Sequence, residues 1–364
     1  MQKVFIYVIT LLFTFPAYGQ FHTMKMPRPS PKVVETQQLG VTDITVEYHS
    51  PAVRGRDVWT QVVPFEGEPI PWRAGANMNT RIRFSTDVQI NGVDFPAGSY
   101  GFHVIPHRQG PWTLLFAEND NQWGSYYLDV DNDVFQKIEV TTDSCTFQEN
   151  LNYAFINRTD STVDVAVQWA HLSIPFTVSV NLDETVVERF RYELSGINTY
   201  RWEAWNDAAQ WCLQRRTNLE EALAWANRSI NGGYGGFAAN KNINNLTTKV
   251  QLLLALGRTA EAKPVIAEAT NLMTQPYEAY NLGNVLMRDL ADFKTAKEFY
   301  QKANEQFPGT WYLVVGGGLT EYFLGNKKEA VSILENAKTQ TPERMHARLD
   351  EIVKEMNAGT FELR

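Results

Sequence analysis

Residues 256–262 read LGRTAEA, residues 290–296 read LADFKTA, and residues 324–330 read LGNKKEA. Each segment begins 34 residues after the previous one and ends in an alanine, and Pro308 and Pro342 keep the same step. A period of this length is typical of a helical hairpin that stacks on the next hairpin. The small alanine lets two helices approach closely, and the proline stops the second helix of a pair. The sequence after about residue 183 therefore predicts an array of paired α-helices.

A glycine-rich stretch interrupts the repeat. Ala222, in an earlier unit, precedes Ala262 by 40 residues instead of 34, and the surplus contains residues 232–236, Gly-Gly-Tyr-Gly-Gly. A phosphate-binding loop would need a strand before it and a Lys-Ser/Thr pair after it. Because neither is present in the sequence, we interpret the stretch as a connection between helices.

One spacing differs between two of the repeat units. The distance from Gly283 to Ala296 is one residue longer than the matching distance from Gly318 to Ala330. We therefore expect a change of register on the inner face of that unit.

Ahead of the repeats, from about residue 41 to residue 180, the dominant pattern has a period of two. Ile44, Val46 and Tyr48 alternate with polar residues, and Asn91-Gly92 favours a tight hairpin turn. Short segments of this kind, separated by turn residues, predict an antiparallel β-sandwich with a jelly-roll-like or another Greek-key order. Further strands are expected at residues 99–105, 112–117, 125–130, 134–141, 145–157 and 162–171.

The N-terminus has the pattern of a secretory signal peptide. Met1-Gln2-Lys3 is followed by an apolar run over residues 4–15 and by small residues before position 20, which predicts cleavage after Gly19. The run is shorter than the roughly 20 residues that cross a bilayer, and no later stretch of the sequence qualifies. We expect an exported protein, in the periplasm or outside the cell, with no transmembrane segment after signal removal.

These patterns divide the chain into five parts. A signal peptide over residues 1–19 and an N-terminal extension over residues 20–39 precede a β-sandwich domain over residues 40–182. A helical linker is expected over residues 183–216, and helical repeats with a C-terminal capping helix over residues 217–364. The predicted fold class is multidomain β + α, an N-terminal antiparallel β-sandwich followed by a tetratricopeptide-like α-solenoid.

Composition limits the partners and the covalent chemistry. The chain has 33 Lys and Arg against 41 Asp and Glu, a formal net charge of −8, so no broad cationic surface is expected to hold nucleic acid or anionic lipid. Cys145 and Cys212 fall in different predicted domains. We interpret them as independent thiols, with a disulfide left open.

Short motifs in the β region resemble one family. They are Trp72-Arg73-x-Gly75-Ala76-Asn77-x-x-Thr80 and Pro96-Ala97-Gly98-x-Tyr100, with Trp123-Gly124 further along the chain. On these motifs, residues from about 39 to 180 resemble the secreted Bacteroidota family known as domain of unknown function 2911, often followed by tetratricopeptide repeats. The resemblance implies no reaction. The acidic connection over residues 66–71 is longer than in the family, and it places different charge at that edge.

The arginine-rich motifs of this region are a candidate ligand site. Three arginines with neighbouring donors and an apolar floor suit a carboxylate, a phosphate or a sugar. The structural alternative puts Asn77 and Gly75 in a left-handed turn, pairs Arg73 with a carboxylate such as Asp87, and uses the tryptophans to plug the sandwich. The candidate residues are Arg54, Arg56, Arg73, Asn77, Thr80 and Trp123.

Metal and catalytic patterns are weak. Asp129, Asp131 and Asp133 alternate like the start of a calcium loop, but Val134 and Val140 replace the glycine and the late glutamate that such a loop needs. A turn between strands is favoured, with calcium as the alternative. The sequence contains no Gly-x-Ser-x-Gly elbow, and we assign no catalytic residue and no cofactor.

The inner face of the solenoid is a candidate protein-binding surface. Repeats of this kind hold a peptide or a partner domain on the concave face of their first helices. Alternatively, that face covers the β domain or a second copy of the chain. The candidate partner-binding residues are Asn281, Asn284, Arg288, Tyr312 and Tyr322.

We therefore expect a non-catalytic binding or scaffolding protein of the cell envelope, with repeats that engage a protein partner and a β domain that holds a small polar or anionic ligand. The first alternative is an envelope hydrolase with groups from the loops near Arg56, Arg73 and Asp129. The second is a purely structural envelope component.

Overall fold

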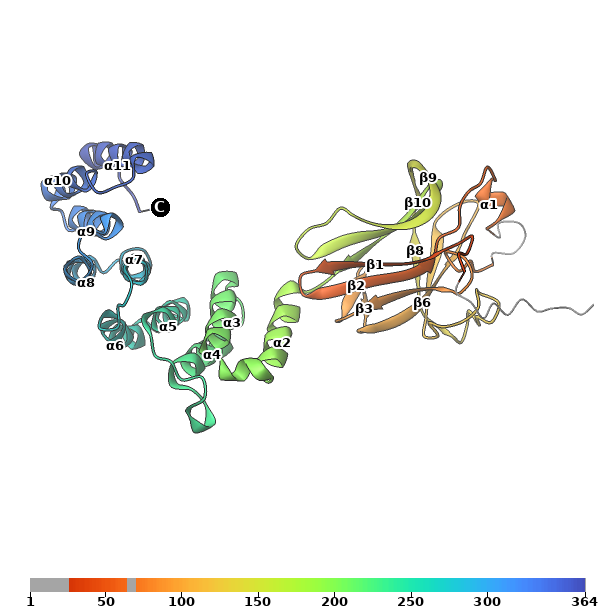
Figure 1. Ribbon diagram of the computed structural model, residues 1–364, viewed down its shortest axis with the longest axis horizontal. Coiled ribbons are helices and arrows are strands. Elements are labelled where there is room, and N and C mark those ends of the chain that lie inside the picture. Colours follow the sequence, from red (N-terminus) through yellow and green to blue (C-terminus); the bar gives the residue numbers. More distant parts are fainter. Residues whose placement is uncertain (1–25, 64–69, 364) are drawn as a thin grey trace, which may run out of the picture. The chain divides into compact units, whose positions relative to one another are not determined.

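The computed structural model describes residues 26–63 and 70–363. The chain divides after Val180 into two compact units, each with its own hydrophobic core (Figure 1). This boundary lies two residues before the expected one. The predicted signal peptide and residues 66–69 of the acidic connection lie outside the described residues. Among the helices that the structure describes, none is both long and apolar enough to span a membrane.

The first unit is an antiparallel β-sandwich, which confirms the predicted fold class of this half. One sheet has the strand order β1-β2-β3-β6-β7-β8 and the other has the order β5-β4-β10-β9. The pairs β3–β6 and β4–β10 join strands that are not consecutive in the chain. The described strands are β1 (Lys32–Leu39), β2 (Thr42–His49), β3 (Thr80–Phe84), β4 (Val88–Ile90), β5 (Val93–Phe95), β6 (Gly98–Ile105), β7 (Trp112–Ala117), β8 (Val134–Val140), β9 (Asp143–Ile156) and β10 (Thr162–Ser179).

The period of two determines which side chains enter the core. In β2, Ile44 and Val46 are fully buried and Tyr48 nearly so, while Glu47 faces outward to an ion pair. Tryptophans fill one region of this core. The rings of Trp72 and Trp169 stack with centroids 6.1 Å apart, and burial of such large rings is a major source of stability.

Two segments of this unit differ from the sequence-based expectations. Part of the expected N-terminal extension is strand β1, which pairs with β2 from Lys32–His49 to Leu39–Thr42. As a half-exposed edge strand, β1 has only a weak apolar alternation. The prediction of a strand at residues 125–130 is wrong, because this segment forms turns. Hydrogen bonds within the loop stabilise them, such as that from the amide of Asp133 to the carbonyl oxygen of Asp129.

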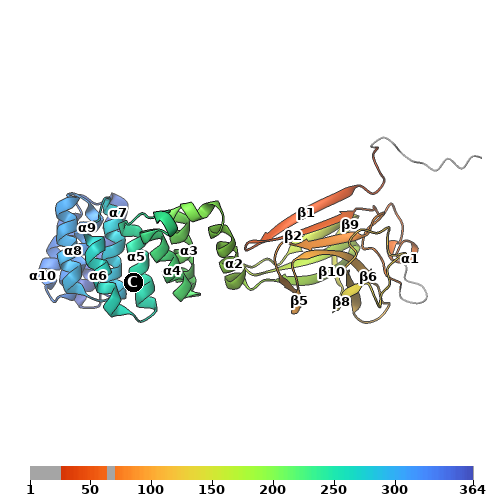
Figure 2. The ribbon, with the colours of Figure 1, turned by 90° about the horizontal axis from the view of Figure 1, so that it is seen from below.

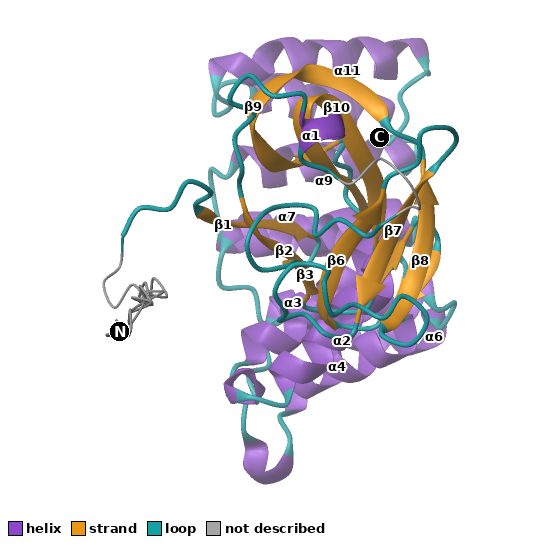
Figure 3. Ribbon diagram, turned by 90° about the vertical axis from the view of Figure 1, so that its right-hand side faces the viewer, coloured by secondary structure: helices purple, strands orange, loops and turns teal. Residues whose placement is uncertain are grey.

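Strand β10 is longer than expected and bends. It continues to Ser179, whereas the sequence suggested an end near His171. Its register with β9 shifts between Gln168 and Leu172, and Ala170 between them has a φ of 51°. Irregularities of this kind bend a strand, and β9 and β10 curve together in Figure 3. The end of β10 pairs with β4.

The second unit is an array of helices, which confirms the predicted helical-repeat class. Neighbouring helices pack as hairpins, for example α5 with α6 and α9 with α10 (Figure 2). In Figure 1, α3, α5, α7, α9 and α11 lie on one side of the array and α4, α6, α8 and α10 on the other. The helices are α2 (Leu182–Leu194), α3 (Trp202–Arg215), α4 (Leu219–Asn231), α5 (Ile243–Ala255), α6 (Thr259–Thr270), α7 (Pro276–Asn284), α8 (Phe293–Gln306), α9 (Trp311–Phe323), α10 (Lys327–Ala337) and α11 (His346–Ala358).

The segment expected as a linker, residues 183–216, is part of the helical unit. It forms α2 and α3, and their buried residues Val187, Leu194 and Cys212 belong to the same core as the repeats. Both Cys145 and Cys212 are free thiols. The glycine-rich stretch connects α4 to α5 and contains a short 3-10 turn, Tyr234–Gly236.

The third unit contains a π turn at the place where a change of register is expected. Helix α7 continues into Val285–Asp289, which has π-helical hydrogen bonding. The positions on either side of this turn keep the 34-residue step, from Val285 to Leu319 and from Leu290 to Leu324, so the π turn changes the winding of the helix without an inserted residue. Turns of this kind are frequent at functional sites.

Candidate functional site

The arginine-rich motif of the β unit holds its own turn together. Nη1 of Arg73 donates a 2.5 Å hydrogen bond to the carbonyl oxygen of Asn77, and the guanidinium lies 5.2 Å from the centre of the Tyr126 ring. Asn77 has a φ of 60°, as the structural alternative expects. The buried Thr80 hydroxyl donates to the carbonyl oxygen of Ala74. These contacts stabilise the turn, and they engage Nη1 of Arg73 and the Thr80 hydroxyl.

Two details of the structural alternative were wrong. The Asp87 carboxylate accepts a hydrogen bond from the amide of Ala97 instead of pairing with Arg73. The second left-handed residue of the turn is Ala74, with a φ of 48°, and not Gly75.

The remaining candidates of the β unit also bond their own loops. Nε and Nη2 of Arg56 donate to the carbonyl oxygens of Val53 and Ala52. Arg54 has a φ of 52°, and its backbone amide donates to Glu149. Trp123 is half exposed, and its backbone bridges to Met78. The structure therefore does not gather Arg54, Arg56, Arg73, Asn77, Thr80 and Trp123 around one described cavity.

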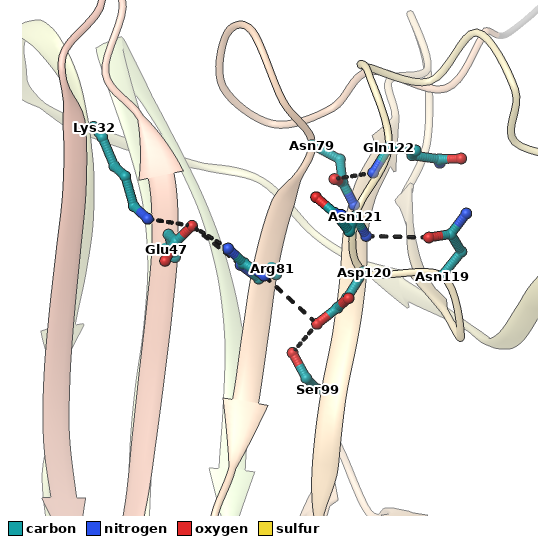
Figure 4. A network of polar contacts seen from close by, with 9 residues as sticks. All are labelled: Lys32, Glu47, Asn79, Arg81, Ser99, Asn119, Asp120, Asn121 and Gln122. Carbon is teal, nitrogen blue, oxygen red and sulfur yellow. Dashed lines mark hydrogen bonds and ion pairs between the residues drawn. The ribbon is translucent and has the colours of Figure 1, made fainter. Parts of the chain in front are cut away.

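A cavity of about 220 Å³ in this unit lies beside a different set of charges, which run across the first sheet (Figure 4). Glu47 accepts from Lys32 at 2.7 Å and from Arg81, and Arg81 lies 3.9 Å from Asp120, which accepts from Ser99. Burial alone would raise the pKa of Glu47, but the two cations hold it below its ordinary value. The positive and negative charges of this row neutralise each other. We therefore interpret the row as cross-strand ion pairs that stabilise the sheet, and not as a ligand site.

His103 is the buried histidine of this unit. A 2.7 Å hydrogen bond joins its Nδ1 to the Ser125 hydroxyl. Its Nε2 lies 3.4 Å from Nε2 of Gln122. Burial, and then the nearby Arg73 guanidinium, lower its pKa to about 4. The ring is thus neutral near pH 7, and it positions the loop that carries Ser125.

The alternating aspartates form a capped turn. Oδ1 of Asp129 accepts from the amides of Asp131 and Asn132, and the amide of Asp129 donates to Asp133. The described part of the chain contains no group of three His, Cys, Asp or Glu side chains arranged to hold a metal ion. Arg56, Arg73 and Asp129, on which the hydrolase hypothesis relied, each bond within their own loop or turn.

Two adjoining cavities lie on one side of the helical unit. One, of about 340 Å³, is lined by α3, α5, α7 and the π turn, and it is mainly polar. The other, of about 420 Å³, is lined by α7, the π turn, α9, α11 and residues 361–363, and it is mainly apolar. Asn284 and Arg288 line both, so the cavities meet at the end of α7 and its π turn.

The repeat period explains how the two cavities arise. Residues at one repeat position, each 34 residues after the last, line them in turn: Thr247, Asn281, Val315 and Leu349. A second series behaves in the same way: Gln251, Val285 and Leu319. Along both series the side chains change from polar to apolar. Superposing the repeat units in the sequence would have identified these lining residues, most of which our sequence analysis missed.

The polar side chains predicted on α7 do meet at this surface. Asn281 and Asn284 lie one turn apart on the helix, and Arg288 follows within the π turn. Within residues 26–63 and 70–363, these three side chains make no hydrogen bond or ion pair. An amide offers both a donor and an acceptor, and a guanidinium offers several donors. The three residues therefore present unused hydrogen-bonding groups to whatever enters the cavities.

The two predicted tyrosines of α9 have different positions. Tyr312 lines the apolar cavity, and its ring packs edge to face against Tyr280 with centroids 5.5 Å apart. Tyr322 instead packs against Phe361 at 5.6 Å, in the core that closes the end of the array. The cavity wall also includes Trp311, which the sequence analysis did not select.

Residues 30–178 match the family described as "Protein of unknown function (DUF2911)". The match covers the sandwich and confirms the resemblance carried by the Trp72–Thr80 and Pro96–Tyr100 motifs. The description assigns no activity. A search of curated proteins found no match.

The helical unit is similar to solved helical-repeat structures. A tetratricopeptide repeat protein from Parabacteroides merdae ATCC 43184 shares 19% identity, with 49% of this chain and 66% of that chain covered and a TM-score of 0.36. MamA from Desulfovibrio magneticus RS-1 shares 19%, covering 43% and 84%, with a TM-score of 0.33. YrrB, described as a TPR protein with an unusual peptide-binding site, shares 18%, covering 44% and 98%, with a TM-score of 0.26. Likeness at these identities concerns the fold alone.

Proposed function

We propose that the helical unit binds an extended segment of a protein partner along its two cavities, and that the protein is a non-catalytic binding or scaffolding protein. One observation carries this proposal. Asn281, Asn284 and Arg288 line the cavities with hydrogen-bonding groups that no described residue uses. Water bonds these groups in the free protein, and a ligand that enters the cavities can take its place.

An extended peptide matches the chemistry of this surface. Its main chain presents donors and acceptors in alternation, and asparagine side chains can bond both. The two cavities follow each other along the repeat axis, because residues one repeat apart line them in series. A segment that runs along this axis would meet the polar cavity first and the apolar cavity next.

The proposal also places the protein outside the cytoplasm, in the periplasm or beyond, as a component of the cell envelope. Its support is the signal-like sequence of residues 1–19. N-terminal sequencing of the protein isolated from fractionated cells tests this part. A chain that begins at Gln20 in the envelope fraction supports it, and an intact Met1 in the cytoplasmic fraction contradicts it.

Peptide display on the full chain tests the binding proposal. Short random peptides are selected on the protein, and the affinities of selected peptides are measured by fluorescence polarisation. We expect the double substitution Asn281→Ala and Asn284→Ala to weaken binding by roughly tenfold or more, because each amide bonds the peptide main chain.

A matched control comes from α8. Lys294 and Glu298 are exposed, and they line neither cavity. Lys294→Ala with Glu298→Ala should leave peptide affinity unchanged. The proposal fails if no peptide is selected, or if the control pair weakens binding as much as the asparagine pair.

A further inference from the structure

The apolar cavity differs from a plain peptide groove because its walls are rich in rings. Tyr280 and Tyr312 pack edge to face, as do Trp311 and Tyr312, both pairs with centroids 5.5 Å apart. Aromatic rings prefer edge-to-face and offset contacts with further rings. At about 420 Å³ the cavity lies within the range of pockets that enclose a small ligand. A single large side chain and its adjoining main chain fit such a space.

One wall of this cavity comes from a non-helical segment. Helix α11 ends at Ala358, and Gly359, with a φ of 74°, turns the chain. The amide of Thr360 donates back to the carbonyl oxygen of Glu355. Phe361 is only 7% exposed and packs against Tyr322 and Phe323 of α9. Figure 1 shows the chain turning back beside the array after α11.

The turned-back segment shows which chemistry this surface accepts. Phe361 and Leu363 pack against the helical cores, while Glu362 between them is exposed. An extended chain alternates its side chains in this way. All three residues line the cavity. The segment therefore forms one wall of the cavity, and its apolar side chains extend the apolar surface that α9 and α11 provide.

Charge adds a second criterion. Arg288 is exposed at the junction of the two cavities and has no carboxylate partner among the described residues. Arg348, on the opposite wall, is already paired with Glu351. Arg288 is therefore the arginine of this cavity that can take up a ligand carboxylate without breaking an ion pair within the protein.

We propose that the apolar cavity is the specificity pocket for one aromatic side chain of the bound segment, and that Arg288 pairs with an acidic residue close to it in the partner's sequence. This inference rests on the proposed peptide binding. It names the partner segment by its chemistry: an extended stretch with an aromatic residue and a nearby Asp or Glu. Tyr312 and Leu363 shape the pocket for the aromatic side chain. Asn281 and Asn284 bind the main chain of the partner segment, whatever its side chains are.

The test uses the full chain and synthetic peptides derived from the display selection. We expect the selected peptides to share an aromatic residue, and its replacement by alanine to lower affinity roughly tenfold or more. In the Tyr312→Ala variant, and separately in Val315→Phe, where the larger side chain fills the cavity, this effect of the aromatic residue should fall to about twofold or less. One variant enlarges the cavity and the other fills it, so the test still stands if one of them does not fold. Circular dichroism shows whether each variant is folded.

The acidic criterion has its own arm. Arg288→Gln should remove the preference for a peptide with Glu over the same peptide with Gln next to the aromatic residue. The inference is overturned if selected peptides lack aromatic residues, or if alanine in place of the aromatic residue is tolerated while the asparagine pair still matters. That result leaves the proposed function intact, whereas a complete absence of peptide binding removes the proposed function itself. N-acetyltryptophan amide that binds as tightly as the peptides would also overturn it, since the pocket would then serve a small molecule.

Discussion

The amide of Leu290 donates a 3.1 Å hydrogen bond to the carbonyl oxygen of Val285, five residues earlier. A regular α-helix would bond to the residue four positions earlier. Beyond this π turn, Ala296 keeps its repeat position and is fully buried in the core. Arg288 lies within this irregular turn and lines both cavities.

Deleting Asp289 tests whether the π turn exists for binding. The deletion removes one residue from the five-residue step between Val285 and Leu290, so a regular α-helical turn can form, and thermal stability measured by circular dichroism should stay equal or rise. Peptide affinity should fall because Arg288 rotates away from the junction. Deletion of Glu298 from the regular helix α8 is the control, and it should lower thermal stability sharply. A loss of stability in the Asp289 deletion equal to that of the control would contradict the prediction.

The Tyr300 ring lies against two glycines, Gly283 of α7 and Gly316 of α9. A Cβ at position 316 would lie 2.4 Å from ring atoms of Tyr300. Gly316→Ala should therefore lower the free energy of unfolding by about 1–3 kcal/mol through overpacking. Urea unfolding of Gly316→Ala, Tyr300→Leu and the double variant checks this. The two effects should partly cancel in the double variant, and strict additivity would show that the ring is not the obstacle.

Gly124 is close to the Arg73 guanidinium. A Cβ at this position would lie 2.5 Å from Cζ of Arg73, and Gly124 has a φ of 65°. Gly124→Ala should displace Arg73 from Asn77 and accelerate amide hydrogen exchange across residues 73–80. Gly110→Ala is the matched control, because Gly110 has a φ of 83° but open space around it. Strain alone costs about 1 kcal/mol or slightly more, so equal exchange in both variants would mean that Arg73 does not hold the turn.

His103 should make stability depend on pH. Its pKa is about 4 in the folded protein against 6.5 for an ordinary histidine. Between these values the unfolded chain binds a proton that the folded protein does not, so the folded state loses stability as the pH falls from 6.5 towards 4. Above 6.5 this contribution is fully present. The loss is on the order of 3 kcal/mol.

Urea unfolding of wild type and His103→Gln across this pH range measures the histidine contribution. Other groups titrate alike in both proteins, so the advantage of wild type should shrink as the pH falls. Two curves that stay parallel would show that the imidazole is accessible to protons in the folded state.

Much of the architecture follows from local periodicity. Alternation in segments such as Ile44-Thr45-Val46 separates a buried from an exposed face, and the step of 34 residues repeats a helical hairpin. These patterns depend on neighbours a few residues apart, so one sequence is enough to recognise them. The sequence analysis did not predict strand β1, because a half-exposed edge strand needs little apolar alternation and so leaves little periodic signal.

The candidate sites show where local reasoning stops. Arg73 was as plausible a ligand group as Arg288 from residue type alone. The structure separates them, because the Arg73 guanidinium reaches the Asn77 carbonyl oxygen, whereas Arg288 meets no described partner.

By itself, the sequence determined two units and their strand and helix periods, because both periods follow from the spacing of apolar side chains along the chain. Only the tertiary structure decided which polar groups are already satisfied and that Thr247, Asn281, Val315 and Leu349 line adjoining cavities. Hydrogen bonds are satisfied by groups that folding brings together in space, and their distance along the chain does not reveal which groups will meet.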